Sequence, residues 1–300
     1  MPTPLFKVLT LDSRSFTTTL PMRLIKMTGG LGNQMFIYAL YLRMRRDFPH
    51  TRIDLSDMQH YHAHHGYEMH RVFALPQTEF CIPQWMKKVM EFVFFKTILE
   101  RHQKGSLKAY RESHFWPLIY YKGFYQSERY FEDFRDEIRE AFTFNAELLS
   151  DTTRQLAQEM QQCMSISLHV RRGDYLLPQF FQNLGSVCTA EYYQRAADFM
   201  QEQFPDARFF VFSDDIAWVK EHVQLPNATY VEHNKGADSW QDMYLMSQCH
   251  HNIVANSSFS WWGAWLNPHA DKLVCCPSIW TRAGGDENLC PASWHRIAVE

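Results

Sequence analysis

The segment Ile166–Tyr175 reads I-S-L-H-V-R-R-G-D-Y and joins a short apolar run to two arginines, a glycine and an aspartate. Its first half alternates, with Ile166, Leu168 and Val170 on one face, so it predicts a short buried β-strand that ends before the glycine. Open α/β sheets bind their ligands outside the carboxyl ends of their strands. We therefore expect function to begin where this strand stops.

The two arginines at this strand end have two interpretations. In the first, Arg171 and Arg172 present rigid, permanently charged donor forks to a diphosphate. In the second, they form structural ion pairs with Asp174 and another acid. The segment alone does not separate these interpretations, so other stretches of the chain have to.

The composition is that of an ordinary globular chain. Its 300 residues are 46% hydrophobic and 21% charged, which is enough for two medium-sized domains with separate cores. The net charge of −3 argues against a general nucleic-acid binder, because binding dominated by phosphate contacts needs a basic surface. The seven cysteines include no C-x-x-C pair, which favours reduced thiols in the cytoplasm.

No window holds the ~18 apolar residues of a membrane span, and residues 1–21 have no signal-peptide core. We expect residues 1–21 to be an N-terminal extension, because the first organised element begins at Met22. The stretch from Trp85 to Leu99, W-M-K-K-V-M-E-F-V-F-F-K-T-I-L, predicts a core helix; a basic amphipathic helix on an anionic membrane surface is the alternative. The sequence thus predicts a cytoplasmic protein, with peripheral contact to the inner membrane face as the alternative.

The first half of the chain opens like a nucleotide-binding fold. Residues 22–48 predict a strand, the glycine-rich turn G-G-L-G-N-Q and a helix, in that order. The glycines match neither G-x-G-x-x-G nor the P-loop, so they support neither an NAD site nor a nucleoside-triphosphate site. We expect Gly30 and Gly32 to let a bulky ligand approach the backbone, and Asn33 to cap the helix or contact that ligand.

A histidine-rich run follows, with a carboxylate inside it. The histidines are His60, His62, His64, His65 and His70. Their spacing matches neither H-E-x-x-H nor a structural zinc site, so we predict no metal site and a polar loop that lines a cleft. Glu68 in this loop is a candidate acid or base, and a surface carboxylate is the alternative.

The second half alternates helix and strand. Helices are predicted over residues 151–163, 190–203, 216–223 and 239–249, and strands over residues 166–170, 208–212, 228–231 and 252–255. This succession predicts a parallel sheet with helices on both faces. Periodicity is lost over residues 143–152, so we predict one domain at 22–147 and a second at 148–300.

Two further strand ends of the second half carry polar groups. Asp214 and Asp215 follow one strand; one acid is expected to cap the next helix, and the other is free to ligate a metal or to accept from N1 and N2 of a guanine. The second turn opens a helix with hydroxyls and free backbone N–H groups that suit a phosphate. Its polar residues are Asn256, Ser257, Ser258 and Ser260. Of the three tryptophans that follow, we expect at least one in the core and another at the cleft.

Four motifs in order, G-G-L-G-N-Q, H-V-R-R-G-D-Y, S-D-D and N-S-S-F-S-W-W-G-A-W, resemble the motif set of the bacterial α-1,2-fucosyltransferases, glycosyltransferase family 11. The resemblance spans residues 29–265. It implies a GT-B fold, in which two Rossmann-like domains face each other across a cleft. It also implies GDP-β-L-fucose as the donor, bound mainly by the C-terminal domain, with no metal and no other cofactor.

The activity that the resemblance implies is an inverting transfer of L-fucose to the 2-hydroxyl of a terminal galactoside. The acceptor would be lactose or a lipid-linked oligosaccharide, in surface glycan synthesis. A fucosyltransferase of another linkage, a transferase for another GDP-sugar, and a non-catalytic glycan-binding GT-B protein are the alternatives.

The resemblance also implies roles for single residues. Arg171 would bind the β-phosphate, where negative charge collects as the bond to the sugar breaks, and Arg172 would share it or brace the loop against Asp174. His169 resembles a nucleotide contact, and Asp214 or Asp215 would read guanine. The phosphate cradle would be completed by Ser257, Ser258 and Ser260, beside Asn256.

The base that deprotonates the acceptor is not named by the motifs. Glu68, Asp174 and His65 are the candidates, in that order. Asn33 is expected to orient the acceptor or the sugar.

Overall fold

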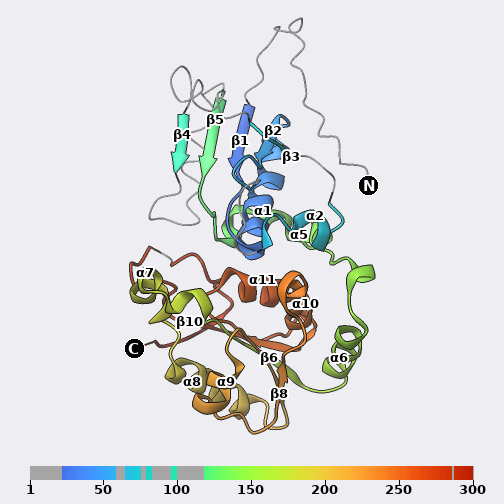
Figure 1. The fold of residues 1–300 in the computed structure, drawn as a ribbon, viewed down its shortest axis with the longest axis vertical. Coiled ribbons are helices and arrows are strands. Elements are labelled where there is room, and N and C mark those ends of the chain that lie inside the picture. Colours follow the sequence, from blue (N-terminus) through green and yellow to red (C-terminus); the bar gives the residue numbers. More distant parts are fainter. Residues whose placement is uncertain are drawn as a thin grey trace, which may run out of the picture.

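The computed structural model describes residues 22–58, 65–75, 79–82, 96–99, 118–285 and 287–299. Within these ranges the chain forms two parallel β-sheets, and Figure 1 shows them in two halves stacked along the long axis of the molecule. This confirms the predicted α/β class. The expectations for residues 1–21, for His60, His62 and His64, and for residues 85–95 lie outside the described residues.

The first sheet has the strand order β3-β2-β1-β5-β4, and all its pairs are parallel. Its strands are β1 (Met22–Lys26), β2 (Thr51–Asp54), β3 (Glu79–Phe80), β4 (Lys96–Leu99) and β5 (Leu118–Lys122). The helix predicted over Trp85–Leu99 is wrong at its carboxyl end, because Thr97 and Ile98 pair with β5. β-Branched side chains favour that extended backbone.

The first helix of this half includes part of the glycine-rich turn, because α1 (Leu31–Asp47) begins at Leu31. Two 3₁₀ turns precede α5 (Arg135–Ala141), because Phe131 and Phe134 leave helical geometry where their rings are buried. The remaining elements are α2 (Met69–Val72), η4 (Glu128–Tyr130), η5 (Glu132–Phe134) and η6 (Ala146–Leu148).

The second sheet is parallel throughout, with the order β11-β10-β9-β6-β7-β8. Its strands are β6 (Ser165–Val170), β7 (Arg208–Ser213), β8 (Ala228–Val231), β9 (His251–Ile253), β10 (Val274–Pro277) and β11 (His295–Ile297). The chain order reverses between β6 and β9. Such a switch point is where open α/β sheets bind their ligands.

Helices cover both faces of this sheet, as the alternation of residues predicts. Phe209 and Val211 of β7 pack toward α8 (Ala190–Gln203) and α9 (Ile216–His222), on the same face as Ile166, Leu168 and Val170. Phe210 and Phe212 pack toward α6 (Asp151–Gln161) and α10 (Trp240–Gln248). The predicted second-half helices and strands are therefore confirmed, within three residues at each end. The predicted boundary between residues 147 and 148 lies between the two sheets in sequence and stays a prediction.

Helix α11 (Ser258–Leu266) joins the two halves through an aromatic core. Figure 1 shows α11 and α10 on the side of the lower half that faces α1. The ring of Phe36 on α1 lies 4.5 Å from that of Trp261 and 4.9 Å from that of Trp262, and Phe131 stacks on Trp262 at 5.5 Å. All three tryptophans of α11 are buried and none lines the cleft described below, so the expectation of a tryptophan at the cleft is wrong.

The two halves approach each other backbone against backbone. A Cβ added to Gly32 of α1 would lie 2.6 Å from the carbonyl carbon of Ser258 at the start of α11. The indole N–H of Trp262 donates to the Gly32 carbonyl at 3.0 Å. Gly32 therefore admits a protein helix rather than a bulky ligand, which corrects the expected reason for this glycine.

We expect Gly32→Ala to destabilise the protein by about 1–3 kcal/mol, because the two backbones would have to separate. Helix propensity alone predicts that the substitution stabilises the protein by about 0.5–1 kcal/mol. The sign of the change in unfolding free energy therefore distinguishes the backbone contact from helix propensity. Urea denaturation measures it. The control is Gly284→Ala, where an added Cβ meets no atom within 4 Å and only the backbone cost of a positive φ remains. A Gly32→Ala midpoint at or above that of the wild type would contradict the close contact.

Candidate active site

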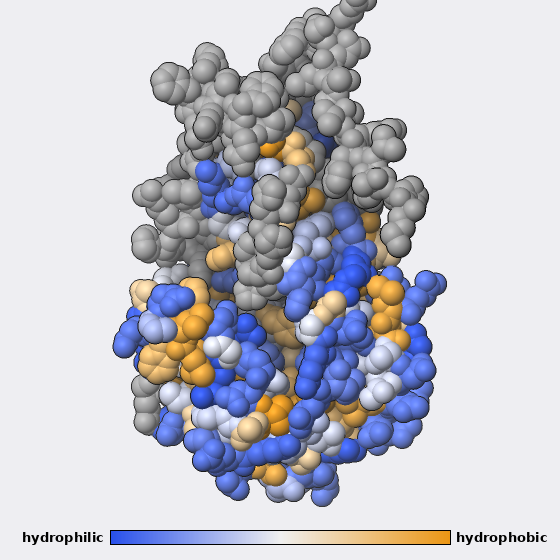
Figure 2. Space-filling view, viewed as in Figure 1, coloured by the Kyte–Doolittle hydropathy of each residue, from blue (hydrophilic) through white to orange (hydrophobic). Residues whose placement is uncertain are grey.

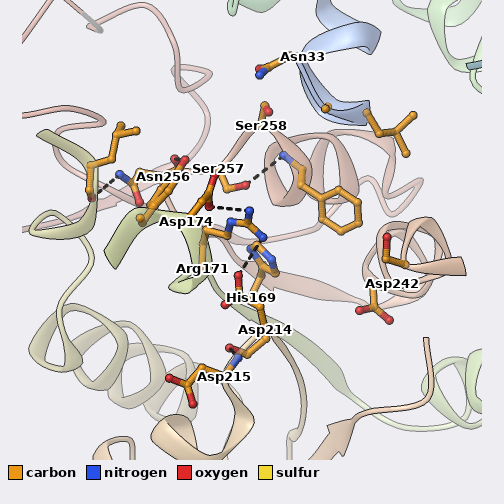
Figure 3. Close-up of a pocket in the computed structure, with 18 of the residues that line it drawn as sticks. Asn33, His169, Arg171, Asp174, Asp214, Asp215, Asp242, Asn256, Ser257 and Ser258 are labelled. Carbon is orange, nitrogen blue, oxygen red and sulfur yellow. Dashed lines mark hydrogen bonds and ion pairs between the residues drawn. The ribbon is translucent and has the colours of Figure 1, made fainter. Parts of the chain in front are cut away.

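A cleft of about 930 Å³ lies between the carboxyl edge of the second sheet and the glycine turn of the first half. This volume is within the roughly 300–1,000 Å³ of small-molecule pockets. The residues that follow β6, β7, β8 and β9 line it on one side, and Gly30, Asn33 and Glu68 line it on the other. Figure 3 shows Asn33 on the side of the cleft opposite Arg171 and Asp214.

Arg171 stands in the cleft between two carboxylates. One terminal nitrogen lies 2.6 Å from Asp174 and the other 2.9 Å from Asp214, and Figure 3 shows both pairs. A guanidinium has five N–H donors, and these two pairs leave others for a ligand. Asp174 thus positions Arg171, which makes it a weaker candidate for the base.

His169 is buried beside Arg171 and lines the same cleft. Burial, and to a lesser degree the charge of Arg171, lowers the pKa of His169 to about 3, so its ring is neutral near pH 7. Among the described residues its Nδ1 has no hydrogen-bond partner. An orphaned buried nitrogen in a cleft is suited to a ligand, since leaving it unpaired costs roughly 1–3 kcal/mol.

The helix α11 points its amino end into the cleft. Ser257 caps it by accepting from the N–H of Phe259 at 3.3 Å. The hydroxyl of Ser258, the next residue, has no hydrogen-bond partner among the described residues, and Ser258 lines the cleft. The free N–H groups of a helix start and its dipole favour an anion. Ser260 does not line the cleft: it is buried and its hydroxyl donates to Ser257, so its predicted place in a phosphate cradle is not supported.

The amide of Asn256 lines the cleft, but its N–H groups already bond to the backbone of neighbouring loops. Its Nδ2 donates to the carbonyl of Leu184 at 3.0 Å and to that of Trp280 at 3.1 Å. Asn256 therefore fixes the surrounding loops.

Arg172 follows the structural interpretation. Its Nε pairs with Asp215 at 3.0 Å, its guanidinium lies 4.0 Å above the ring of Trp218, and it does not line the cleft. Asp215 also caps α9 by accepting from the N–H of Trp218 at 3.1 Å; this bond first, and Arg172 second, lowers the pKa of its carboxyl. Both arginines therefore form ion pairs within the fold, but only Arg171 lines the cleft, and its binding of a diphosphate stays a prediction.

Both carboxylate oxygens of Asp214 already have a partner. Its Oδ1 accepts from the backbone N–H of Arg172 at 2.9 Å, and its Oδ2 pairs with Arg171. Asp215 lines the cleft and is held by Arg172 and by α9. Neither acid is therefore without partners in the fold, and the reading of guanine by one of them stays a prediction.

A different acid of the cleft has one carboxylate oxygen without a hydrogen-bond partner among the described residues. Asp242, in the first turn of α10, is partly enclosed by the fold, and the loss of hydration there raises the pKa of its carboxyl to about 7. Asn234 donates to its Oδ1 at 2.8 Å, and its Oδ2 accepts no hydrogen bond from the described residues. Figure 3 shows Asp242 and Asn256 on opposite sides of Arg171.

Sequence reasoning missed Asp242, although a signal was present. Leu245 and Met246 follow it at i+3 and i+4 and are buried. A carboxylate on the apolar stripe of a helix is unusual and marks an acid that is drawn toward the interior.

The opposite wall of the cleft is held together by Gln34. Its amide donates to the carbonyls of Gly29 at 2.9 Å and Gly66 at 2.7 Å and accepts from the N–H of Glu68 at 3.1 Å. The glycine turn is thereby tied to the loop that carries Glu68. Asn33 accepts from Gln126 at 2.7 Å and lines the cleft.

Glu68 is a buried carboxylate in this wall. Burial raises its pKa, against an opposing hydrogen bond from Arg71 at 2.8 Å. A raised pKa brings a carboxylate closer to the basicity that proton abstraction needs. His65 also lines the cleft and is exposed.

Neither a metal cluster nor a membrane span occurs in the described part of the chain. Within the ranges given above, no group of three or more His, Cys, Asp or Glu side chains is arranged to hold a metal ion. No described helix combines the length and the apolar character needed to cross a membrane.

Known proteins resemble this chain along most of its length. The family described as Glycosyl transferase family 11 matches residues 13–279. The Escherichia coli alpha-1,2-colitosyltransferase is 31% identical over 285 residues, which cover 91% of this chain and 97% of that protein. Human galactoside alpha-(1,2)-fucosyltransferase 1 is 29% identical over 160 residues, which cover 50% of this chain and 43% of that protein.

A solved structure resembles the fold. The NodZ alpha-1,6-fucosyltransferase co-crystallized with GDP aligns with a TM-score of 0.52 at 15% identity, covering 83% of this chain and 93% of that one. The fold is GT-B, with two Rossmann-like halves facing across a cleft, as predicted. From the matched motifs and the extent of the similarity, the chain belongs to glycosyltransferase family 11.

Proposed function

We propose that this chain transfers L-fucose from GDP-β-L-fucose to the 2-hydroxyl of a terminal galactoside, with inversion. The observation that carries the proposal is the convergence of Arg171, His169 and the amino end of α11 on one cleft. These groups offer fixed donors for a diphosphate without a metal ion. The GDP in the NodZ structure supports a GDP-linked donor, and the names of the relatives support transfer of a fucosyl or a colitosyl group.

The diphosphate lies between Arg171 and the start of α11 in this proposal. Negative charge grows on the diphosphate as the sugar departs in an oxocarbenium-like state. Donors held in place by Asp174 and Asp214 need no reorganisation at that moment, so they stabilise the transition state more than the ground state. Ser257 and Ser258 add the helix start, and His169 supplies a neutral ring nitrogen.

We assign recognition of the guanine to Asp242 rather than to Asp214 or Asp215. Its ionised carboxylate matches the N1 and N2 donors of guanine as a bidentate acceptor. Its support is a chain of hydrogen bonds in which Thr153 donates to Asn234 at 3.1 Å and Asn234 donates to Asp242. This chain uses one lone pair of Oδ1, so Oδ2 and the second lone pair of Oδ1 can both accept from the ligand.

The acceptor enters against the wall formed by the first half. Glu68 is our candidate for the base, because it is a cleft carboxylate whose pKa burial raises and which does not pair with Arg171. Asn33 would orient the acceptor or the sugar from the same wall.

A transfer assay with lactose and a panel of GDP-sugars tests the function, with linkage analysis of the product. GDP-colitose belongs in the panel as the second candidate donor, because a relative that covers 91% of this chain is named an alpha-1,2-colitosyltransferase. Colitose lacks the 3-hydroxyl of L-fucose, so a comparison of transfer from GDP-fucose and from GDP-colitose measures the contribution of that hydroxyl alone. Absence of GDP release with every donor would contradict the enzyme and favour a glycan-binding protein.

Arg171→Lys should lower kcat/KM by about 10²–10³-fold, the usual cost of losing one preorganised donor to developing charge. An ammonium cannot pair with two carboxylates and still present a planar fork. The matched control is Arg172→Lys, which changes the neighbouring residue whose side chain lies outside the cleft. We expect that variant to stay within a few-fold. Equal losses in the two variants would contradict the division of roles.

GDP should bind less tightly as the pH falls below about 7. Asp242 must be ionised to accept from guanine. Because the pKa of its carboxyl is raised to about 7, Asp242 binds a proton at lower pH, and this proton must leave before guanine binds. Well below that pKa, the dissociation constant for GDP should rise tenfold for each pH unit. Because phosphate also titrates near pH 6, calorimetry should compare the wild type with Asp242→Asn, which should bind weakly and with a flatter profile. Glu232→Gln, at an exposed cleft carboxylate, is the control. Identical profiles for wild type and Asp242→Asn would exclude the assignment.

Glu68→Gln should reduce kcat by about 10²–10⁴-fold, the range of general-base catalysis, and leave the affinity for GDP unchanged. Single-turnover kinetics together with GDP calorimetry separate the two quantities. A variant that transferred at the wild-type rate would remove Glu68 as the base.

A further inference from the structure

The segment from Gly173 to Gly185 lies at the edge of the cleft, and only some of its residues line it. It forms η7 (Gly173–Leu176), α7 (Pro178–Phe180) and the π-helical turn η8 (Phe181–Gly185). Four large apolar side chains of this segment are 40–45% exposed, half of all such exposed side chains among the described residues. These four residues, Leu176, Leu177, Phe180 and Phe181, are called the apolar rim below.

The backbone behind the apolar rim is anchored. Arg282 donates from its guanidinium to the carbonyl of Ser186 at 2.8 Å and from its backbone to that of Asn183 at 3.1 Å. Asn256 donates to the carbonyl of Leu184 at 3.0 Å. The apolar side chains are thus held outward on a fixed frame, and exposed apolar patches of this kind mark binding surfaces.

The apolar rim continues into the cleft. Phe180 lines the cleft together with Leu184 and Trp280. Figure 1 shows α7 at the edge of the lower half beside the junction of the two halves, and Figure 2 shows apolar side chains gathered there. A ligand that fills the cleft and extends out of it on this side meets the rim next.

The chemistry of the segment favours a neutral, polyhydroxylated ligand. No charged side chain and no histidine occurs from Tyr175 to Ala190. Gln179 and Gln182 are exposed among the apolar residues and offer both donors and acceptors, and Asn183 offers its amide N–H groups while its Oδ1 accepts from the N–H of Ala283. An anionic lipid surface would call for several lysines or arginines, and this segment has none; the neighbouring Arg282 donates to the carbonyl of Ser186.

We propose that the apolar rim binds the saccharide units of the acceptor that lie beyond its terminal galactose. Phe180 and Phe181 stack on the C–H faces of the pyranose rings, and the neighbouring amides bond to their hydroxyls. The inference rests on the proposed glycosyl transfer and adds the class of acceptor: an oligosaccharide longer than a disaccharide. The rim thereby selects for chain length.

The test is a double variant, Leu177→Ser with Phe181→Ser, at two exposed positions outside the cleft lining. With a tetrasaccharide acceptor that ends in galactose, kcat/KM should fall about tenfold, mainly through KM. With lactose it should change less than twofold, and the KM for the GDP-sugar should not change. The matched control is Met164→Ser, a methionine 40% exposed just before β6, at the end of the sheet away from the cleft.

Equal losses for lactose and the tetrasaccharide, or no loss for either, would overturn the rim as an acceptor site. Binding to phosphatidylcholine vesicles that the double variant loses would assign the rim to a lipid surface instead and overturn it too. If the wild type transfers no sugar, the proposed function fails separately. Saturation-transfer NMR of the tetrasaccharide with the GDP-loaded protein then decides. Saturation transfer in the wild type that disappears in the double variant supports the rim, and no saturation transfer in the wild type overturns it.

Discussion

The contact between Gly32 and the start of α11 is the constraint on which the rest of the structure depends. It brings the glycine turn after β1 against the helix that follows β9, so the carboxyl edges of both sheets face one cleft. The aromatic cluster around Trp262 fills the space behind it. At the other end of α11, Arg139 from the first half donates to the carbonyls of Trp265 and Leu266. A helix held at both ends in this way keeps its amino end at a fixed place in the cleft.

The cleft combines cations and carboxylates. Arg171 is balanced by Asp174 and Asp214, Lys235 also lines the cleft, and the other donors are a helix start, serine hydroxyls and a neutral histidine. In the proposed function, these donors let a chain with a net charge of −3 accommodate an anion locally. The two carboxylates also restrict the rotation of the Arg171 guanidinium.

Burial acts in opposite directions on two titratable groups of the cleft. It lowers the pKa of His169 to about 3 and raises that of Asp242 to about 7. In both cases it disfavours the charged form, because an enclosed charge loses its hydration. Burial therefore reduces the charge at these two positions of the cleft, and in the proposed function a nucleotide supplies the partners that each group lacks.

The sequence by itself determined the succession of helices and strands in the second half, the Rossmann-type opening and the motifs that place polar residues at strand ends. Period and turn chemistry are local, so they can be read from the chain. Strand ends and helix starts carry their own donors, so they also marked Arg171, Arg172, Ser257 and Ser258 as candidates, and the family resemblance added His169. Only the tertiary structure decided which acid is free and which arginine faces the cleft. Asp214 and Asp215 are engaged by neighbours that the sequence does not identify as their partners, and Arg172 turns toward Trp218. Such properties arise from contacts between residues far apart in the chain, so local pattern identifies the candidates and packing assigns their partners.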